Sequence, residues 1–159
     1  MGGKEFRQAL GRFSTGVCLI TVNDRDSGAL ALTANSFSSV SLDPPLVLWS
    51  IQNNSECFRE YTENEYFAFS VMASDQAALS GKYARRGEHA VEPAEFSNNT
   101  HDVPLLNGAI AHFSCRLFAL HEAGDHHIVV GEVLDFQTAD GAPLLFSNGQ
   151  YDELASVAK

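Results

Sequence analysis

Two long apolar segments near the end of the chain, residues 111–120 and 126–138, constrain the fold most strongly. In the first, AHFSCRLFAL, the apolar positions alternate with their neighbours: Phe113, Cys115, Leu117 and Ala119. A period of two residues is typical of a strand with one buried face, because successive side chains point to opposite faces. The second segment, HHIVVGEVLDFQT, is also strand-like, and a turn then leads into a short strand over residues 144–147. The last third of the chain is therefore expected to be β-structure.

Earlier segments give the same signal. Residues 17–23 (VCLITVN) and 29–35 (ALALTAN) flank the turn DRDSG and predict a β-hairpin. Asp-Pro-Pro at 43–45 breaks the chain before a strand over 46–52, and another strand is expected over 66–73. Six or more strands with two or three short helices predict a mainly β fold. We expect an antiparallel β-barrel that closes on itself, since closure removes exposed strand edges.

A short helix is expected at the start of the chain. Residues 4–16 place Phe6, Leu10 and Phe13 on one helical face, and Gly16 is suited to end the helix. No internal repeat, linker or low-complexity tract follows it.

Two further helices are expected in the middle of the chain. Ser55 or a neighbouring Asn is expected to cap the first. Asp75 is expected to cap the second, over residues 76–84. Residues 84–106 turn polar and predict a long loop, and long loops are often functional.

Composition limits the class of protein. The chain has 159 residues, 45% of them hydrophobic and 19% charged, which fits one domain, residues 1–159, with a substantial core. The net charge of −10 argues against nucleic acid and anionic membranes as partners, because phosphate-rich surfaces attract basic faces. No apolar run approaches the roughly 18 residues that cross a bilayer, and MGGKEFRQ, which lacks an apolar stretch, is not expected to act as a secretion signal. We therefore expect a cytoplasmic protein.

The three cysteines are expected to be reduced core residues. Cys18, Cys57 and Cys115 lie far apart, and none belongs to a C-x-x-C pair.

The segment over residues 32–55, LTANSFSSVSLDPPLVLWSIQNNS, is unusually polar for a stretch between two apolar strands. Its first half carries five hydroxyls and an amide: Thr33, Asn35, Ser36, Ser38, Ser39 and Ser41. These side chains could bond to their own backbone, or form a polar cradle for a heterocycle, a ribityl chain or a phosphate. Phe37, Val40 and Leu42 are expected to anchor the loop to the core. A second polar patch, residues 50–55, leads into a helix start, where phosphates bind well.

A histidine pair lies in GDHHIVVGEV, residues 124–133. His126 is the better candidate for contacting an anionic or amide-bearing substrate, and His127 is expected to be solvated in a surface turn. The spacing matches no zinc motif, so no metal is predicted from the other candidates: His112, His121, Glu122 and Asp125. The motifs GxGxxG and GxxxxGK[ST] are absent, so any nucleotide must bind through another architecture.

Five segments together resemble the flavin reductase family, whose fold is the FMN-binding split barrel, an antiparallel Greek-key barrel with a few short helices. They are FRQALGRFSTGVCLITV, LTANSFSSVSLDPPLVLWSI, PLLNGAIAHFSCRL, GDHHIVVGEV and PLLFSNGQY. They follow one another in the family's order and span nearly the whole chain. The most specific feature is the combination of SxSVSLDPP with GDHxIxxGEV.

The resemblance implies a set of site residues. Flavin contacts are implied for Thr33, Ala34, Asn35, Ser36, Ser38, Ser39, Ser50, Ile51, Gln52 and Ser55. Lys82 and Arg85 of GKYARR correspond to a family segment near the phosphate end, and Tyr151 flanks the same groove. His126 falls on the histidine expected near the nicotinamide nucleotide. Residues 87–100 match no family segment.

The resemblance also implies the reaction. It implies an NAD(P)H:flavin oxidoreductase that reduces FMN or FAD by hydride transfer from NADH or NADPH. The reduced flavin would pass, by diffusion, to a partner monooxygenase, and the reductase would be a homodimer. Two alternatives remain: a non-enzymatic flavin-binding electron carrier on the same barrel, and a pyridoxamine-phosphate oxidase-like barrel acting on pyridoxal phosphate, haem or cobalamin-type substrates. The histidine of GDHH argues against the first, and the pairing of SVSLDPP with GDH argues against the second.

Overall fold

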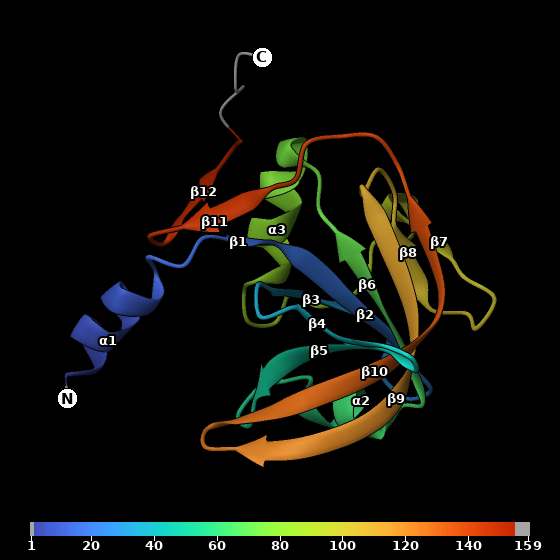
Figure 1. Ribbon diagram of the computed structural model, residues 1–159. Helices are drawn as coiled ribbons and strands as arrows, with labels where there is room; N and C mark the ends of the chain where they lie inside the picture. Colours follow the sequence, from blue (N-terminus) through green and yellow to red (C-terminus); the bar gives the residue numbers. More distant parts are fainter. Residues whose placement is uncertain (1, 155–159) are drawn as a thin grey trace.

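The computed structural model describes residues 2–154, which form mainly antiparallel strands with a few short helices (Figure 1). The strands are β1 (Thr15–Gly16), β2 (Cys18–Asp24), β3 (Gly28–Ala34), β4 (Ser38–Leu42), β5 (Pro45–Gln52), β6 (Tyr66–Val71), β7 (Phe96–Asn98), β8 (Pro104–Leu106), β9 (Ala111–Ala123), β10 (His126–Thr138), β11 (Leu145–Ser147) and β12 (Gln150–Asp152). The helices are α1 (Gly3–Leu10), α2 (Phe58–Glu63) and α3 (Ala77–Tyr83), with 3-10 turns η1 (Ser74–Gln76) and η2 (Pro93–Glu95).

Seven strands form the main sheet, in the order β3-β2-β6-β9-β10-β5-β4, and every neighbouring pair is antiparallel. The predicted antiparallel split barrel is confirmed. The expectation that the barrel closes on itself is wrong, because the edge strands β3 and β4 are not hydrogen-bonded to each other. The edge of β3 instead pairs with a loop: the Ala31 N–H donates to the His89 carbonyl at 2.8 Å, and the Val91 N–H donates to the Ala29 carbonyl at 3.0 Å.

The strand β2 is buried on both faces and separates two cores. Ile20 and Val22 face the interior of the barrel, where they join Trp49 and Phe69. Leu19, the residue before Ile20, faces the second core under α3. This double burial explains why residues 17–23 read as a continuous apolar run instead of an alternating one.

The helix α1 is shorter than expected. It ends at Leu10 because the chain turns at Gly11, whose carbonyl accepts a hydrogen bond from the Asn148 N–H at 2.8 Å. Gly16 therefore ends no helix and lies in β1 instead. The apolar residues of this segment are exposed, Phe6 by 52% and Phe13 by 79%, and Figure 1 shows α1 standing apart from the barrel.

The expected helix caps also differ from those observed. Ser55 lies before α2: its hydroxyl accepts the Cys57 N–H at 3.3 Å, and no side chain caps α2 itself. Asp75 lies inside the turn η1, so it does not cap α3. Gln76 does the bonding there, since its side-chain oxygen accepts the Ala73 N–H at 3.0 Å.

Residues 84–106 are more ordered than a structureless loop. They contain η2 and the two-stranded sheet of β7 and β8.

The strand β4 presents its apolar residues to solvent, contrary to expectation. Leu42 is 95% exposed and Val40 is 49% exposed, so neither anchors this segment to the core. Phe37 alone does so, because its ring packs against Phe69 and Phe113 at centroid distances of 5.0 and 5.6 Å.

The cysteines are free and buried, as predicted. Burial raises the pKa of Cys18 and of Cys115 to about 12, and that of Cys57 to about 11. These thiols therefore stay protonated and act as small apolar core residues.

Among residues 2–154, no helix is both long enough and apolar enough to cross a membrane.

Candidate functional site

A cavity of about 390 Å³ opens where β3 and β5 end. Its walls come from the ends of these strands, from the segments that follow them, and from the chain after α3. The lining residues are Leu32, Thr33, Ala34, Asn35, Ser36, Trp49, Ser50, Ile51, Gln52, Asn54, Ser55, Glu56, Ala84, Arg86, His89 and His126. The structure therefore brings nine of the predicted site residues together: Thr33, Ala34, Asn35, Ser36, Ser50, Ile51, Gln52, Ser55 and His126.

Two hydroxyls of the polar segment hold the walls of this cavity together. The Ser36 hydroxyl accepts the Ser50 N–H at 2.9 Å and donates to the Ser50 carbonyl at 3.3 Å. The Thr33 hydroxyl donates to the Ser80 carbonyl at 2.7 Å, which ties β3 to α3. The interpretation that such hydroxyls bond to backbone therefore holds for Ser36 and Thr33.

Other polar side chains of the cavity remain available to a ligand. Within residues 2–154, no hydrogen bond is formed by the side chains of Asn35, Ser50, Gln52 and Asn54. A wall with unpaired amides and a hydroxyl suits a ligand rich in donors and acceptors, such as a heterocycle with a polar tail.

His126 lies at the rim of this cavity, at the first position of β10 and opposite Gln52 of β5. Its Nδ1 is 2.6 Å from Oδ1 of Asp125. A carboxylate only accepts, so Nδ1 carries the proton and Nε2 is left for a further partner. The hydrogen bond from His126 lowers the pKa of Asp125, which keeps that carboxylate charged.

His127 is not solvated in a surface turn, as was expected, but is half-buried on β10. Its ring contacts Phe58 edge-on at a centroid distance of 5.0 Å, and its Nδ1 is 2.8 Å from Oδ1 of Asn53. Asn53 in turn bonds to the carbonyl of Gly124. His127 therefore helps to hold the β9–β10 hairpin against the segment that follows β5.

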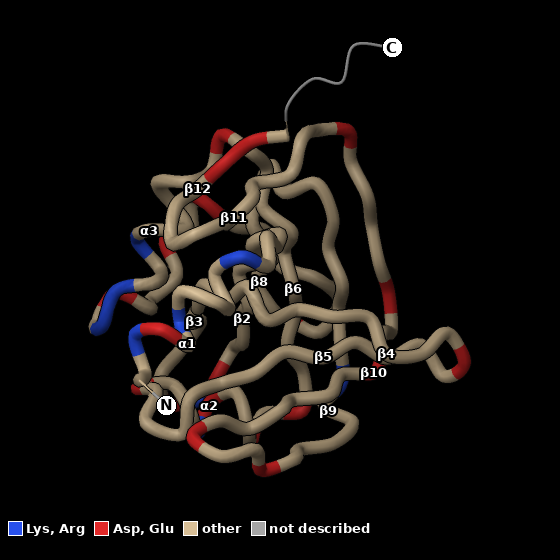
Figure 2. Tube along the Cα trace, turned by 60° about the vertical axis from the view of Figure 1, so that its left-hand side comes forward, with Lys and Arg blue, Asp and Glu red and all other residues tan. Residues whose placement is uncertain are grey.

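Of the three basic residues near the end of α3, one lines the cavity and two do not, and Figure 2 shows basic positions beside the α3 label at one side of the molecule. Of the basic residues near the end of α3, Arg86 lines the cavity. Lys82 pairs with Glu95 at 3.2 Å, and Arg85 pairs with Glu88 at 3.7 Å. The structure therefore places neither Lys82 nor Arg85 at the cavity, although both were predicted to bind there.

Three further predicted residues also lie outside the cavity lining. Ser38 and Ser39 are exposed on β4, where the Ser38 hydroxyl donates to the Ser39 carbonyl. The Tyr151 hydroxyl is 2.8 Å from that of Ser80, the residue whose carbonyl binds Thr33. Tyr151 thus contacts α3 and does not line the cavity.

Sequence reasoning missed several cavity residues. Leu32, Trp49 and Ala84 are apolar and carry no signal that separates them from core residues. Arg86 adjoins the predicted Arg85, and only the direction of the chain after α3 distinguishes the two. Glu56 and His89 lie in segments with no recognised motif.

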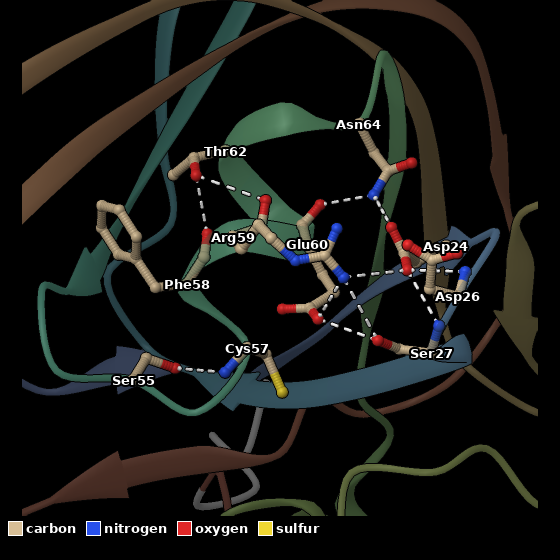
Figure 3. A network of polar contacts seen from close by, with 10 residues as sticks. All are labelled: Asp24, Asp26, Ser27, Ser55, Cys57, Phe58, Arg59, Glu60, Thr62 and Asn64. Atoms are coloured by element: carbon tan, nitrogen blue, oxygen red, sulfur yellow. Dashed lines mark hydrogen bonds and ion pairs between the residues drawn. The ribbon is translucent and has the colours of Figure 1, made fainter.

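A polar network fixes α2, the helix after the cavity wall (Figure 3). Oδ2 of Asp24, at the end of β2, is 3.3 Å from Nη2 of Arg59, which also contacts Oε1 of Glu60 at 3.0 Å. Asn64 donates to Oδ1 of Asp24, and the Ser27 hydroxyl donates to Oε1 of Glu60. The network therefore joins α2 to the β2–β3 turn and supports the segment that carries Ser55.

A second, smaller cavity of about 240 Å³ lies near the far ends of β9 and β10, and no predicted site residue lines it. His112 contributes to its wall, and the Nδ1 of His112 is 3.1 Å from the buried Ser70 hydroxyl. Burial lowers the pKa of His112, so this histidine is neutral at pH 7. Among the described residues, no group of three or more His, Cys, Asp and Glu side chains is arranged to hold a metal ion.

Comparison with known proteins identifies the class. Residues 10–155 match the flavin reductase like domain, and the chain belongs to this family. FMN reductase (NADH) SmoA of Agrobacterium fabrum is 45% identical over 148 residues, which cover 93% of this chain and 84% of that protein. The reductase component of the flavin-dependent trigonelline monooxygenase of Acinetobacter baylyi is 36% identical over 148 residues; here the chain spans about half of the relative, 48% of its length.

A solved structure agrees with this assignment. The NADH:FAD oxidoreductase SgcE6 of Streptomyces globisporus, in complex with NAD and FAD fragments, superimposes with a TM-score of 0.92 at 32% identity. The match covers 98% of this chain and 94% of that one.

Proposed function

We propose that this protein is an NAD(P)H-dependent flavin reductase that reduces FMN or FAD and supplies the reduced flavin to a partner monooxygenase. One observation carries the proposal: the two polar stretches of the family motif and His126 line a single cavity. The relatives agree, since SmoA is named an FMN reductase that uses NADH, and the Acinetobacter relative is the reductase component of a flavin-dependent monooxygenase.

The residues of the cavity fit a flavin. Leu32, Ala34 and Trp49 supply apolar wall, and the unpaired side chains of Asn35 and Gln52 supply donors and acceptors for the edges of the ring and its polar tail. A bound flavin supplies the chemistry itself, because its ring accepts a hydride from the C4 position of a reduced nicotinamide. The protein supplies orientation, since hydride transfer needs the two rings held at about 3–3.5 Å.

His126 is proposed to bind the nicotinamide nucleotide. Asp125 holds Nδ1 of the imidazole, so the ring presents its Nε2 at the rim of the cavity, at the end of the wall that carries Gln52. This position suits contact with the second substrate, the reduced nicotinamide nucleotide. No side chain has to move a proton during the hydride step.

Aerobic oxidation of NADH, measured with and without FMN, FAD and riboflavin, tests the proposal. We expect oxidation of NADH or NADPH only when flavin is added, with FMN or FAD preferred. A non-enzymatic carrier would retain flavin through gel filtration and oxidise neither nucleotide. A barrel of the pyridoxamine-phosphate oxidase type would bind pyridoxal phosphate, haem or a cobalamin in preference to flavin, so titrations with these compounds and with flavins identify it.

The assembly is proposed to be a homodimer of a single-domain cytoplasmic protein, with flavin bound near the boundary between subunits. Large apolar side chains on β4, β9 and β10 are exposed to solvent and support this proposal. Leu42 is 95% exposed, Phe118 is 55% exposed and Phe136 is 66% exposed. Light scattering at micromolar protein should give twice 17.3 kDa, and a value near 17.3 kDa would exclude the dimer. Reduced flavin that reaches the monooxygenase by diffusion should bind at about micromolar strength, near −8 kcal/mol.

A further inference from the structure

One carboxylate, that of Glu56, joins the two walls of the cavity. Its Oε2 accepts the Gly87 N–H at 2.7 Å and lies 3.4 Å from Nε2 of His89, while its Oε1 lies 3.3 Å from Nε of Arg86. Glu56 follows β5, whereas its partners belong to the segment after α3. The carboxylate therefore helps to fix the position of Arg86 and Gly87 in the segment of residues 84–89.

The far end of this segment is fixed without Glu56. The carbonyl of His89 accepts the Ala31 N–H at 2.8 Å, and Nδ1 of His89 is 3.3 Å from the Ala31 carbonyl. Its near end is fixed by α3. The part between, which contains Arg86 and Gly87, contacts the opposite wall through Glu56.

Arg86 is held in a way that leaves its outer nitrogens available. Its side chain is 84% exposed, and its contact with Glu56 uses Nε. Within residues 2–154, Nη1 and Nη2 of Arg86 form no hydrogen bond or ion pair. A guanidinium fixed through Nε presents these two nitrogens as a planar fork, which matches two oxygens of a phosphate. The charges of Lys82 and Arg85, by contrast, are paired outside the cavity.

A carboxylate beside a phosphate would normally repel it. Here the Gly87 N–H, Arg86 and His89 surround the Glu56 carboxylate, and the Gly87 hydrogen bond contributes most to lowering its pKa. The negative charge of Glu56 is therefore offset by Arg86, and its carboxylate oxygens are already bound by groups of residues 86–89. What remains for a ligand is the donor fork of Arg86.

We infer that Glu56 is a positioning residue, held by the Gly87 N–H, that orients the guanidinium of Arg86 to bind the phosphate of a flavin nucleotide. The inference rests on the proposed function, and it assigns a role to an acidic residue that contacts the ligand only through its neighbours. Its consequence is selective: Glu56 matters for FMN and FAD, which carry phosphate, and not for riboflavin, which has none.

Flavin titrations of the full chain, monitored by calorimetry, test this inference. FMN, FAD and riboflavin are titrated into the wild type, Glu56→Ala, Glu56→Gln, Arg86→Ala and the Glu56→Ala/Arg86→Ala double variant. Glu56→Ala and Arg86→Ala should each weaken FMN binding about tenfold or more, the range of a lost charge-assisted hydrogen bond, and leave riboflavin affinity near the wild-type value. Glu56→Gln should lose less FMN affinity than Glu56→Ala, because its amide oxygen still accepts a hydrogen bond from the Gly87 N–H.

The double variant separates an indirect role from an independent one. If Glu56 acts through Arg86, the double variant should lose no more FMN affinity than the worse single variant. Glu88→Gln is the matched control: its carboxylate pairs with Arg85 outside the cavity, so all three affinities should be unchanged.

Three results would overturn the inference. If Glu56→Ala weakens riboflavin binding as much as FMN binding, Glu56 only supports the fold. If Glu56→Ala binds FMN more tightly than the wild type, the charge of Glu56 repels phosphate. If the losses of FMN affinity in the double variant are additive, Glu56 acts without Arg86. If Glu56→Ala does not fold, as judged by circular dichroism, Glu56→Gln and the exposed Arg86→Ala decide by the same comparison with riboflavin. A wild type that binds no flavin would instead refute the proposed function.

Discussion

The hydroxyl of Ser36 bonds to both backbone groups of Ser50, accepting from its N–H at 2.9 Å and donating to its carbonyl at 3.3 Å. These residues belong to the two polar stretches of the family motif, which β4 and the turn before β5 separate in the chain. The pair sets the distance between the walls of the cavity. One of the motif hydroxyls is therefore used to build the site, while its neighbour Asn35 has an unpaired side chain that lines the cavity.

Replacing Ser36 with Ala should lower both stability and flavin affinity. The change leaves the Ser50 N–H without its partner, at a cost of about 1–3 kcal/mol. Urea unfolding gives the first effect and FMN titration the second. The control is Ser38→Ala, since the hydroxyl of Ser38 is exposed and bonds only to the next carbonyl. Equal behaviour of the two variants would contradict the bridging role of Ser36.

Trp49 should report flavin binding through its fluorescence. It is the single tryptophan of the chain, is fully buried, and lines the cavity. Indole emission overlaps flavin absorption, so a flavin held against this wall should quench the emission in a saturable way. Trp49→Phe should abolish the signal while calorimetry still detects binding. Binding without quenching in the wild type would place the flavin elsewhere.

Replacing His126 with Ala should raise the KM for NADH and leave FMN affinity nearly unchanged. A lost neutral hydrogen bond costs about 0.5–1.5 kcal/mol and a charge-assisted one about 1.5–3 kcal/mol. The value of kcat/KM should therefore decrease by a factor between about three and about one hundred. Steady-state kinetics and FMN titration of the same variant separate the two ligands. If His126→Ala chiefly weakens FMN, its proposed role is wrong.

The control for this prediction must be chosen with care. The sequence suggests His127, but the contacts of His127 with Asn53 and Phe58 mean that His127→Ala should lower stability. His121 is a better control because it is exposed on β9 and forms no hydrogen bond within the described residues. His121→Ala should leave both KM and stability at the wild-type values.

The network around Asp24 should make stability depend on pH in acid. Hydrogen bonds from Asn64 and from the Ser27 N–H hold the pKa of Asp24 well below its usual range. A lowered pKa stabilises the folded state fully above the unfolded-state pKa of about 3.9, and this contribution is lost as the pH falls below it. The difference in unfolding free energy between wild type and Asp24→Asn should therefore be largest at pH 7 and shrink below about pH 4.

Urea titrations at several pH values measure this difference. Asp26→Asn serves as the control, because the carboxylate of Asp26 is exposed and forms no hydrogen bond within the described residues. Its effect should be small at every pH. A constant difference for Asp24→Asn down to pH 3 would rule out the proposed linkage.

Much of the fold was predictable because its strands are apolar segments bounded by turn residues. The prediction for residues 126–138 has the bounds of β10, and the predicted hairpin corresponds to β2 and β3. The pairing of β3 with residues 89–91 was not predictable, because backbone hydrogen bonds between distant segments leave no pattern in the side chains. Exposed apolar residues such as Leu42 misled the prediction for β4, since periodicity reports hydrophobicity and not what covers it.

The site was predictable where a motif carries it. The stretches that contain Asn35, Gln52 and His126 are recognisable from their residues, and the structure brings them together. The residue proposed to bind the flavin phosphate was not predictable, because three cations lie within five residues. Only the direction of the chain after α3 decides that Arg86 lines the cavity. Glu56 shows the same limit, since its importance depends on a loop that is distant in the sequence.

The glycine of the GEV motif is explained by packing. A Cβ at Gly131 would lie 2.6 Å from Cζ of the buried Phe67 and 3.0 Å from Cβ of Cys115. Gly131→Ala should therefore destabilise the fold by about 1–3 kcal/mol, the range for overpacked cores. Gly81→Ala is the opposite case, because Gly81 lies inside α3 with open space around it, and alanine there should stabilise by about 0.5–1 kcal/mol. Urea unfolding of the two variants should give shifts of opposite sign. An unchanged midpoint for Gly131→Ala would show that β10 can move away from Phe67, and the glycine would then need a functional explanation.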